Sequence, residues 1–268
     1  MSENNPYRPP AATVEDPAST NPPGELHPPR TCPAGHGTRW IAEGFEFFRR
    51  DPWMWILNVI IFFTIMMILG MAPFLSLVSS LLGPVFVGGL ILGCRDQDQG
   101  RPLEVAHVFA GFQNQTGRLV AVGALNLLAS LLLFGLAMIV IMMLGGMDML
   151  NTMGGLENGN VSPEQAAGLM LPMLLALLVV MLFAVPVAML FWFAPTLVVL
   201  HPEVGVTEAL GLSFRGCLRN MLPFLIYGLV LLVLAIVATI PFMLGWLVLG
   251  PVFFGSVYAS YKDIYLAD

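Results

Sequence analysis

The sequence predicts an all-α polytopic membrane protein with six transmembrane helices arranged as three hairpins. Hydrophobic residues make up 57% of the 268 residues and charged residues only 10%, whereas soluble domains average about 45–50% and about 25%. No charged residue occurs from Trp53 to Cys94 or from Met221 to Tyr261. Each run is roughly twice the ~20 residues that cross a hydrocarbon core, so each predicts a pair of spans.

Glycine and proline mark the turns inside these two runs. Gly70 and Pro73 interrupt the first run, and Pro241 interrupts the second. Proline cannot continue a helix, and glycine favours the position where a helix ends. The two runs therefore predict the first, second, fifth and sixth spans.

A third apolar region lies between the two runs. A span is expected from about Leu119 to Gly145, and a polar stretch follows it. Ser162 and Pro163 then have the pattern of an N-cap and a first helical turn. The helix that follows stays apolar as far as Leu200, about 55 Å at 1.5 Å per residue, which is too long for one straight crossing. Kinks are expected at Pro172, Pro186 and Pro195.

The basic residues decide between six and seven spans. With six spans, all eleven lie on one side of the membrane, which the positive-inside rule identifies as the cytoplasm. They are Arg8, Arg30, Arg39, Arg49, Arg50, Arg95, Arg101, Arg118, Arg215, Arg219 and Lys262. A seventh span would move the last three across the membrane. We therefore predict a multi-pass protein of a bacterial inner membrane with both termini in the cytoplasm.

The first 38 residues differ from the rest of the chain. Nine of the 21 prolines lie between Pro6 and Pro33, among polar residues with few aliphatic side chains. Such a segment cannot bury enough apolar surface to fold alone, so 1–38 is predicted to be a disordered cytoplasmic tail and 39–268 the membrane domain. The tail contains a P-x-x-P pattern in NPYRPP, which suggests docking to other proteins; a plain solvated tail is the alternative.

Two nearly identical apolar phrases indicate an internal repeat. GPVFVGGLILGCRD spans 83–96 and GPVFFGSVYASYKD spans 250–263. Small residues at every fourth position let helix backbones approach closely in a membrane. The proposed packing residues are Gly83, Pro84, Gly89, Gly93, Gly250, Pro251, Ser256 and Ser260, and the proposed interfacial anchors are Arg95, Asp96, Lys262 and Asp263. We predict that the second and sixth spans pack side by side, with the small residues of the two phrases facing each other; two unrelated helices with similar packing are the alternative.

Segments before the first, third and fifth spans extend this repeat. WIAEGFEFF, PLEVAHVFAGF and VTEALGLSFRGCL each place apolar residues on one helical face. Each lies on the expected cytoplasmic side, next to a span, as an interfacial amphipathic helix does. The sequence therefore predicts three units, about 39–98, 102–201 and 205–266, each made of an amphipathic helix and a membrane hairpin.

The spans contain little that points to catalysis. The six expected spans hold no Asp, Glu, Lys, Arg or His, whereas proton relays and general acid–base catalysts need such a group. Asn58 and Asn126 are the most polar span residues, and we expect them to bond to a neighbouring helix. No catalytic or cofactor-binding residue is predicted, and the protein is not expected to be an enzyme.

Two groups of residues contain side chains of types that bind metals, but neither group predicts a metal site. His27, Cys32 and His36 match no standard ligand spacing. Eight methionines lie between Met138 and Met173; their thioethers suit Cu(I), but methionine also fills ordinary gaps in apolar packing. No metal ligand is assigned.

Five segments carry a resemblance to a known family: PAGHGTRWIAEGFEFF, GPVFVGGLILGCRD, FWFAPTLVVLH, SFRGCLRNMLPFLIYG and SVYASYKDIY. Over residues 33–266 the chain resembles an uncharacterised family of proteobacterial integral membrane proteins. More loosely, its layout is similar to the membrane domain of some glycerophosphodiester phosphodiesterases. The resemblance implies an inner-membrane location and no catalytic residue, and the sequence has no separate phosphodiesterase domain.

These observations predict a non-catalytic scaffold or lipid-contacting module. Its expected partners are the lipid bilayer and, through residues 1–38, other membrane or cytoplasmic proteins, but not nucleic acid. The alternative is a facilitator or permease for a small or hydrophobic substrate, with a path between the three hairpins.

Overall fold

The computed structural model describes residues 25–157 and 163–266, which fold almost entirely into helices. Within them, strand pairing is limited to a bridge between Leu26 and Leu266, so the all-α prediction is confirmed for this part of the chain. The helices are α1 (His36–Arg50), α2 (Pro52–Gly70), α3 (Pro73–Asp98), the 3₁₀ helix η1 (Val105–Phe112), α4 (Thr116–Glu157), α5 (Pro163–Phe191), α6 (Ala194–Leu200), α7 (Val206–Arg219), α8 (Met221–Thr239) and α9 (Trp246–Tyr265).

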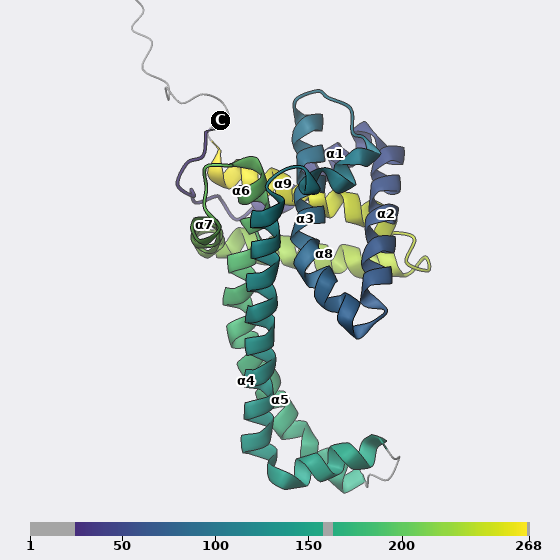
Figure 1. The fold of residues 1–268 in the computed structure, drawn as a ribbon, viewed down its shortest axis with the longest axis vertical. Coiled ribbons are helices and arrows are strands. Elements are labelled where there is room, and N and C mark those ends of the chain that lie inside the picture. Colours follow the sequence, from purple (N-terminus) through teal and green to yellow (C-terminus); the bar gives the residue numbers. More distant parts are fainter. Residues whose placement is uncertain (1–24, 158–162, 267–268) are drawn as a thin grey trace, which may run out of the picture.

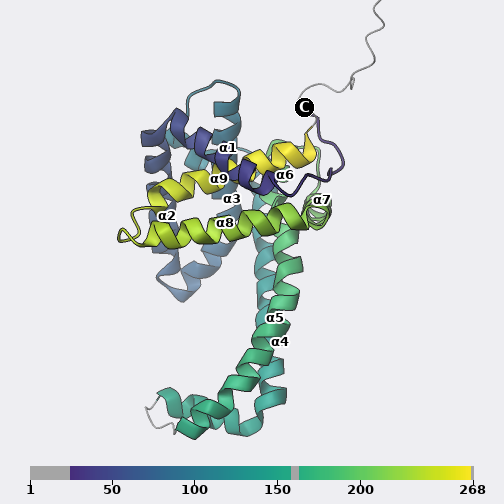
Figure 2. The same cartoon turned by 180° about the vertical axis from the view of Figure 1, so that it is seen from behind.

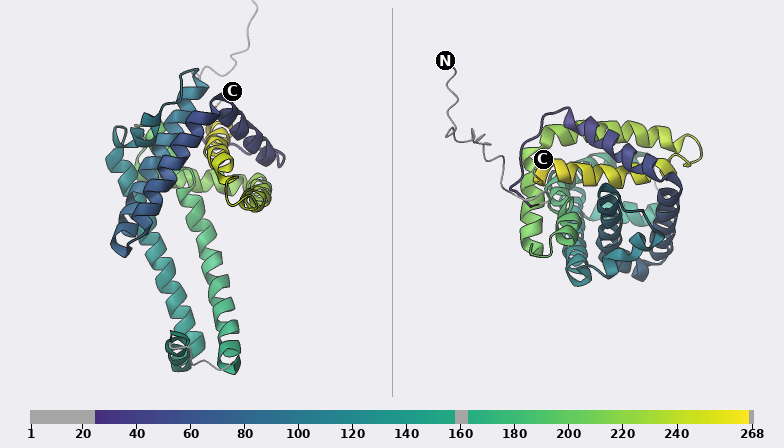
Figure 3. Two further views of the ribbon diagram at one scale, coloured as in Figure 1. Left: turned by 90° about the vertical axis from the view of Figure 1, so that its right-hand side faces the viewer. Right: turned by 90° about the horizontal axis from the view of Figure 1, so that it is seen from above.

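Three helical hairpins, each preceded by a short helix, make up the fold (Figure 1). α1 precedes the α2–α3 hairpin, η1 precedes the α4–α5 hairpin, and α7 precedes the α8–α9 hairpin. The first two hairpins run along the long axis of the molecule, and α4–α5 extends well beyond α2–α3 (Figure 1). The third hairpin crosses the first at a steep angle, with α1 lying along it (Figures 2 and 3).

Local sequence explains where the first hairpin begins and turns. The Asp51 carboxylate caps α2 by accepting a hydrogen bond from the backbone N–H of Met54 at 3.2 Å, and Pro52 occupies the first turn. α2 ends at Gly70 and α3 begins at Pro73. These are the two residues at which the sequence predicts a turn.

The long apolar segment after α4 breaks into two helices. α5 begins at Pro163, whereas its expected N-cap, Ser162, lies outside the described residues. α5 continues through both of its internal prolines and ends at Phe191. After a bend at 192–193, α6 carries Pro195 in its first turn. The bend directs α6 into the protein interior, where most of its residues are buried.

Among the described residues, five helices are long and apolar enough to cross a membrane: Pro52–Gly70, Phe74–Asp98, Thr116–Met143, Met170–Leu200 and Met221–Thr239. They expose large apolar side chains such as Phe74, Leu132 and Leu225. α9 is not one of the five, because its serines, its tyrosines and the terminal Lys262 and Asp263 lower its apolar content. Most of α9 is buried instead, between α1 and the α2–α3 hairpin.

The chain before α1 is docked on α9, which corrects the prediction that the tail is disordered as far as residue 38. The backbone N–H groups of His27 and Arg30 donate to the carbonyl oxygens of Tyr265 and Ile264 at 2.8 and 2.9 Å. The last carbonyls of a helix lack partners within it, and this segment supplies them. Residues 1–24 lie outside the described residues.

The end of α7 holds the same segment from the other side. The Arg219 guanidinium donates to the carbonyl oxygen of Pro29 at 2.6 Å. Asn220 donates to the carbonyl oxygen of Arg30 at 2.9 Å and accepts from the backbone N–H of Cys32 at 2.7 Å. A polar, proline-rich composition predicts disorder because it lacks apolar surface, yet here backbone hydrogen bonds to helix ends order the chain.

Removing this docked segment should destabilise the protein. We expect a chain that starts at residue 34 to melt below one that starts at residue 25. Several hydrogen bonds are lost, each with a net contribution of about 0.5–1.5 kcal/mol. Thermal unfolding of the two truncations in the same detergent measures the difference, and equal melting temperatures would show that docking contributes nothing.

The small residues of the repeated phrases do not face each other as predicted. A Cβ at Gly89 or Gly93 would collide with η1 or the loop before it, whereas Ser256 lies against Gly44 of α1. The prediction that Gly89 and Gly93 face Ser256 and Ser260 is therefore wrong. α3 and α9 do touch, but small residues at four-residue spacing show only that some element comes close, not which one.

Candidate functional site

The second helix of each hairpin packs against the short helix of a neighbouring unit. α3 packs against η1, α5 and α6 pack against α7, and α9 packs against α1. The last of these contacts returns to the beginning of the chain (Figure 3). The three contacts, or junctions, therefore form a ring, in which each unit contacts the next and the last unit contacts the first. The C-terminal ends of α3, α6 and α9 lie together at one end of the molecule.

A residue with a small side chain marks each junction. A Cβ on Gly111 of η1 would collide with the backbone of α3, and one on Gly44 of α1 would collide with the backbone of α9. At the third junction, the hydroxyl of Ser213 in α7 donates to a carbonyl oxygen of α5 at 2.7 Å. The carbonyl oxygens approached are those of Val85, Val252 and Met189. Phenylalanine follows each small residue, as Phe45, Phe112 and Phe214.

Two of the three junctions also carry a carboxylate. Asp263 in α9 accepts a hydrogen bond from Trp40 Nε1 at 2.7 Å, and Asp96 in α3 lies 3.2 Å from His107 Nε2. Trp40 and His107 stand at the same place, four residues before the junction glycine. At the third junction both corresponding residues are apolar (Leu200 and Ala209).

Asp263 makes more bonds than a surface anchor would. Arg30 Nη2 donates to one carboxylate oxygen at 2.9 Å, and His36 Nδ1 lies 2.6 Å from the other. With Trp40 as a third partner, the side chain is only 10% exposed. The carboxylate therefore joins the docked segment, α1 and the end of α9.

The remaining predicted anchors also pair within the protein. Arg95 lies 3.2 Å from Asp96, which pairs more closely with Arg101 at 2.6 Å. Lys262 Nζ lies 2.6 Å from Asp98 Oδ2 and so links α9 to α3. These residues connect helices at the end of the molecule where the three junctions meet.

The glycines and prolines that open the two phrases lie near α2. A Cβ at Gly83 would meet only the Met66 side chain at 3.9 Å, and one at Gly250 would lie 3.0 Å from Val59. Pro84 and Pro251 follow inside α3 and α9, and both helices continue through them.

Cys32, His36 and Asp263 bring ligand-type atoms within 4.8 Å of one another. Both oxygens of the carboxylate already have partners in Arg30 and Trp40. Burial raises the pKa of the Cys32 thiol to about 12, whereas a metal ligand must be a thiolate. The donor set therefore fits a structural hydrogen-bonded cluster better than a metal centre.

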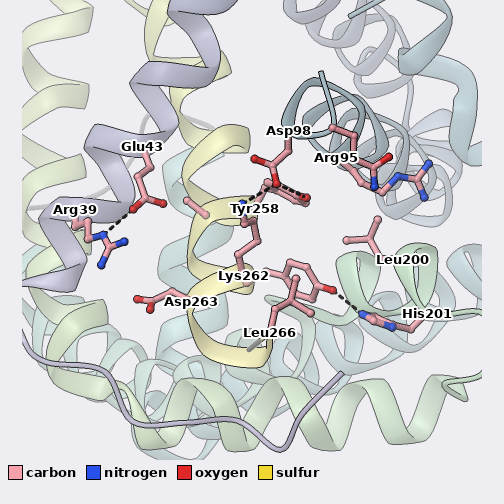
Figure 4. Close-up of a pocket in the computed structure, with 13 residues that line it drawn as sticks. Arg39, Glu43, Arg95, Asp98, Leu200, His201, Tyr258, Lys262, Asp263 and Leu266 are labelled. Carbon is pink, nitrogen blue, oxygen red and sulfur yellow. Dashed lines mark hydrogen bonds and ion pairs between the residues drawn. The ribbon is translucent and has the colours of Figure 1, made fainter. Parts of the chain in front are cut away.

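A cavity of about 690 Å³ opens beside this cluster, between the ends of α3, α6 and α9 and the side of α1 (Figure 4). Its wall is mostly charged and aromatic. It includes Arg39, Glu43, Arg95, Asp98, His201 and Lys262. The sequence singled out Arg95 and Lys262 but missed the others. The signal that could have found Asp98 is its position in the last turn of α3, three residues after Arg95.

In the ion pairs of this wall, the basic group is more exposed than its partner. Lys262 is 40% exposed and Asp98 26%, while Arg39 is 61% exposed and Glu43 39%. The carboxylates lie deeper because protein donors hold them; Tyr258, for example, donates to Asp98 at 3.3 Å.

His201 lines the cavity on the side of α6. Its Nε2 lies 2.5 Å from the Tyr261 hydroxyl and its Nδ1 lies 3.1 Å from Glu203 (Figure 4). Burial lowers the pKa of His201 although Glu203 opposes the shift. The imidazole is therefore neutral at pH 7 and links α6 to α9 as a hydrogen-bonding group.

A relative of similar length decides the family. The chain is 30% identical over 207 residues to a probable inner membrane protein of Burkholderia thailandensis, and the match covers 75% of this chain and 73% of that relative. The chain belongs to this family of inner membrane proteins. No family model and no solved structure matches it. The relative supports the resemblance to proteobacterial membrane proteins and a multi-pass inner-membrane location, but not the looser likeness to phosphodiesterase membrane domains.

Apolar grooves separate the hairpins of this inner membrane protein. One of about 530 Å³ lies between α5 and α8 and includes Trp192 and Phe224. Another of about 570 Å³ lies between the α2–α3 and α8–α9 hairpins and includes Phe63 and Leu232. Both lie among helices with exposed apolar side chains.

The two polar span residues are placed differently. Asn58 is fully buried, and its Nδ2 donates to the carbonyl oxygen of Met54 in the same helix at 2.8 Å. The expected bond from Asn58 to a neighbouring helix is therefore not formed, and its Oδ1 has no partner. Asn126 is half-buried on α4.

Proposed function

We propose that this inner membrane protein is a non-catalytic module that contacts lipid and serves as a membrane scaffold. The observation that carries the proposal is the separation of charged from apolar groups. The ion pairs of the described residues lie on α1, η1, the adjoining loops and the ends of α3, α6 and α9, whereas α2, α4, α5 and α8 expose apolar side chains. Most of the surface is therefore suited to lipid, and the uncharged runs offer no group for acid–base chemistry.

Six spans with both termini in the cytoplasm remain the proposed topology. It is supported by the basic residues, which all fall on one side in this arrangement. α8 has 19 residues and an apolar tip follows it, with Phe242 and Met243 exposed. Because α8–α9 crosses α2–α3 steeply (Figure 2), the tip of the third hairpin tests the proposal most directly.

Labelling from the periplasm should reach that tip. In a background without native cysteines, Met243→Cys should react with an impermeant maleimide added to intact spheroplasts. Gln99→Cys should react only after the membrane is opened. Protection of position 243 would show that the third hairpin does not cross, and a reporter fused after Asp268 that reads periplasmic would overturn the orientation.

The lipid-contacting role predicts that phospholipid remains bound after purification. Mass spectrometry of the protein extracted in mild detergent should find retained lipid, and also any protein that depends on residues 1–38. Leu232→Ser together with Phe63→Ser should reduce lipid retention, because both residues line an apolar groove. Retention as low as that of a soluble control protein would contradict the proposal.

A facilitator or permease is the second candidate, and the cavity of about 690 Å³ is the observation that favours it. Solute-stimulated flux in proteoliposomes distinguishes this candidate from a scaffold, which should show none.

A further inference from the structure

We propose that the cavity at the ends of α3, α6 and α9 binds a phosphate-bearing anion through Arg95 and Lys262. This inference rests on the lipid-contacting function proposed above and names the chemistry of its polar contact. The phosphate group is common to phospholipid headgroups and to soluble phosphate esters, and the experiment below separates these two sources.

Both basic residues keep hydrogen-bond donors for a ligand. Lys262 Nζ donates to Asp98 at 2.6 Å, and an ammonium group has three donors. Arg95 uses Nε and Nη2 toward Asp96, at 3.3 and 3.2 Å, while a guanidinium has five. Their side chains are 40% and 37% exposed. A phosphate oxygen entering the cavity can therefore meet charged donors without breaking these ion pairs.

Two of the three acidic residues of the wall, Asp98 and Asp263, are less accessible than Arg95 and Lys262, and the third, Glu43, is paired with Arg39 at 2.7 Å. Asp98 accepts from Lys262 and Tyr258. Asp263 is 10% exposed and is held by Arg30 and Trp40. Around Arg95 and Lys262, the carboxylates are therefore already held by protein donors and lie deeper than the two basic groups.

Three helix C-termini near one cavity would by themselves oppose an anion, since each carries a negative partial charge. At two of these three ends, those of α9 and α3, other donors already bond to carbonyl groups. The backbone N–H groups of His27 and Arg30 bond to the end of α9, and the Arg50 guanidinium donates to the carbonyl oxygen of Gln97 in α3 at 2.9 Å. The charged side chains of Arg30 and Arg50 donate to the carbonyl oxygens of Asp263 and Gln97 and thus offset part of the negative field at these two ends.

The repeat itself places the two proposed contacts. Arg95 and Lys262 occupy the same position in the two apolar phrases, and the middle unit, 102–201, has Val199 there. Two equivalent helices thus direct one basic residue each toward a shared cavity. The volume of about 690 Å³ exceeds that of a phosphate group alone and leaves space for a headgroup.

The test titrates the full chain in neutral detergent with three probes: inorganic phosphate, glycerol 3-phosphate and short-chain phosphatidylglycerol. Calorimetry and the shift in melting temperature measure binding. Arg95→Gln combined with Lys262→Gln should raise the dissociation constant at least about tenfold, which is the effect of losing one charged hydrogen bond. Asp98→Asn should lower the dissociation constant, because the substitution removes a competing carboxylate and keeps Lys262.

Arg49→Gln is the control, because Arg49 is also an arginine paired with a carboxylate, that of Glu46, but does not line the cavity. It should leave binding unchanged. Binding of phosphatidylglycerol alone identifies a lipid headgroup, and equal binding of glycerol 3-phosphate identifies a soluble ester; both support the proposal. Failure of all three probes, or equal losses in the control and the double variant, overturns it. Phospholipid retained in the apolar grooves would then still support the lipid-contacting function.

Discussion

Replacing Gly111 with alanine should destabilise the protein strongly, because η1 could no longer lie on α3. The new Cβ would collide with the backbone carbonyl of Val85, and backbone in the middle of a helix cannot move aside as a flexible side chain can. Overpacking of this kind costs about 1–3 kcal/mol, occasionally more. For a chain of this size, 2 kcal/mol corresponds to a fall of about 4–8 °C in melting temperature.

Gly135 provides the matched control for this substitution. It also lies in a helix, α4, but apart from its chain neighbours and the backbone of its own helix, no heavy atom would lie within 4 Å of an added Cβ. Gly135→Ala should be neutral or stabilise the helix by up to about 1 kcal/mol. Equal melting temperatures for Gly111→Ala and Gly135→Ala would show that the close approach of η1 to α3 is not present in the membrane-extracted protein.

Removing the charge of Asp263 should have the second large effect. Asp263→Asn would leave the Arg30 guanidinium and His36 without their carboxylate partner at a side chain that is only 10% exposed. Breaking a buried pair by removing one partner costs about 3–5 kcal/mol. Arg30 is 44% exposed, so water screens part of the interaction and we expect a loss near the lower end, about 3 kcal/mol.

Glu46→Gln tests whether burial is the reason. Glu46 also pairs with an arginine, Arg49, at 3.0 Å, but the two side chains are 59% and 62% exposed. Exposed pairs contribute about 0–1 kcal/mol, so this variant should unfold close to the wild type. If both substitutions lowered the melting temperature equally, the burial of Asp263 would not explain its effect.

The sequence alone determined the class of protein, the turns of the first and last hairpins and the order of short helix and hairpin, whereas α4 continues to Glu157, beyond the expected end of its span near Gly145. Hydropathy depends on composition, and turns depend on local residues such as Gly70 and Pro73, so both can be read without knowing what packs against them. The repeated phrase also identified Arg95 and Lys262, because equivalent positions in a repeat are visible in one dimension. The same signal could not identify Arg39 or His201, which enter the cavity wall from other elements.

Only the tertiary structure decided which segments meet. The four-residue spacing of Gly89 and Gly93 shows that something approaches the helix, but the partner is η1, from the following unit, and not α9. Likewise, the composition of residues 25–35 lacks the apolar surface that folding of a segment in isolation requires. It is ordered by carbonyl groups at the end of α9, more than 220 residues away along the chain. Contacts of this length depend on where the ends of other helices lie in space, which no local pattern of residues encodes.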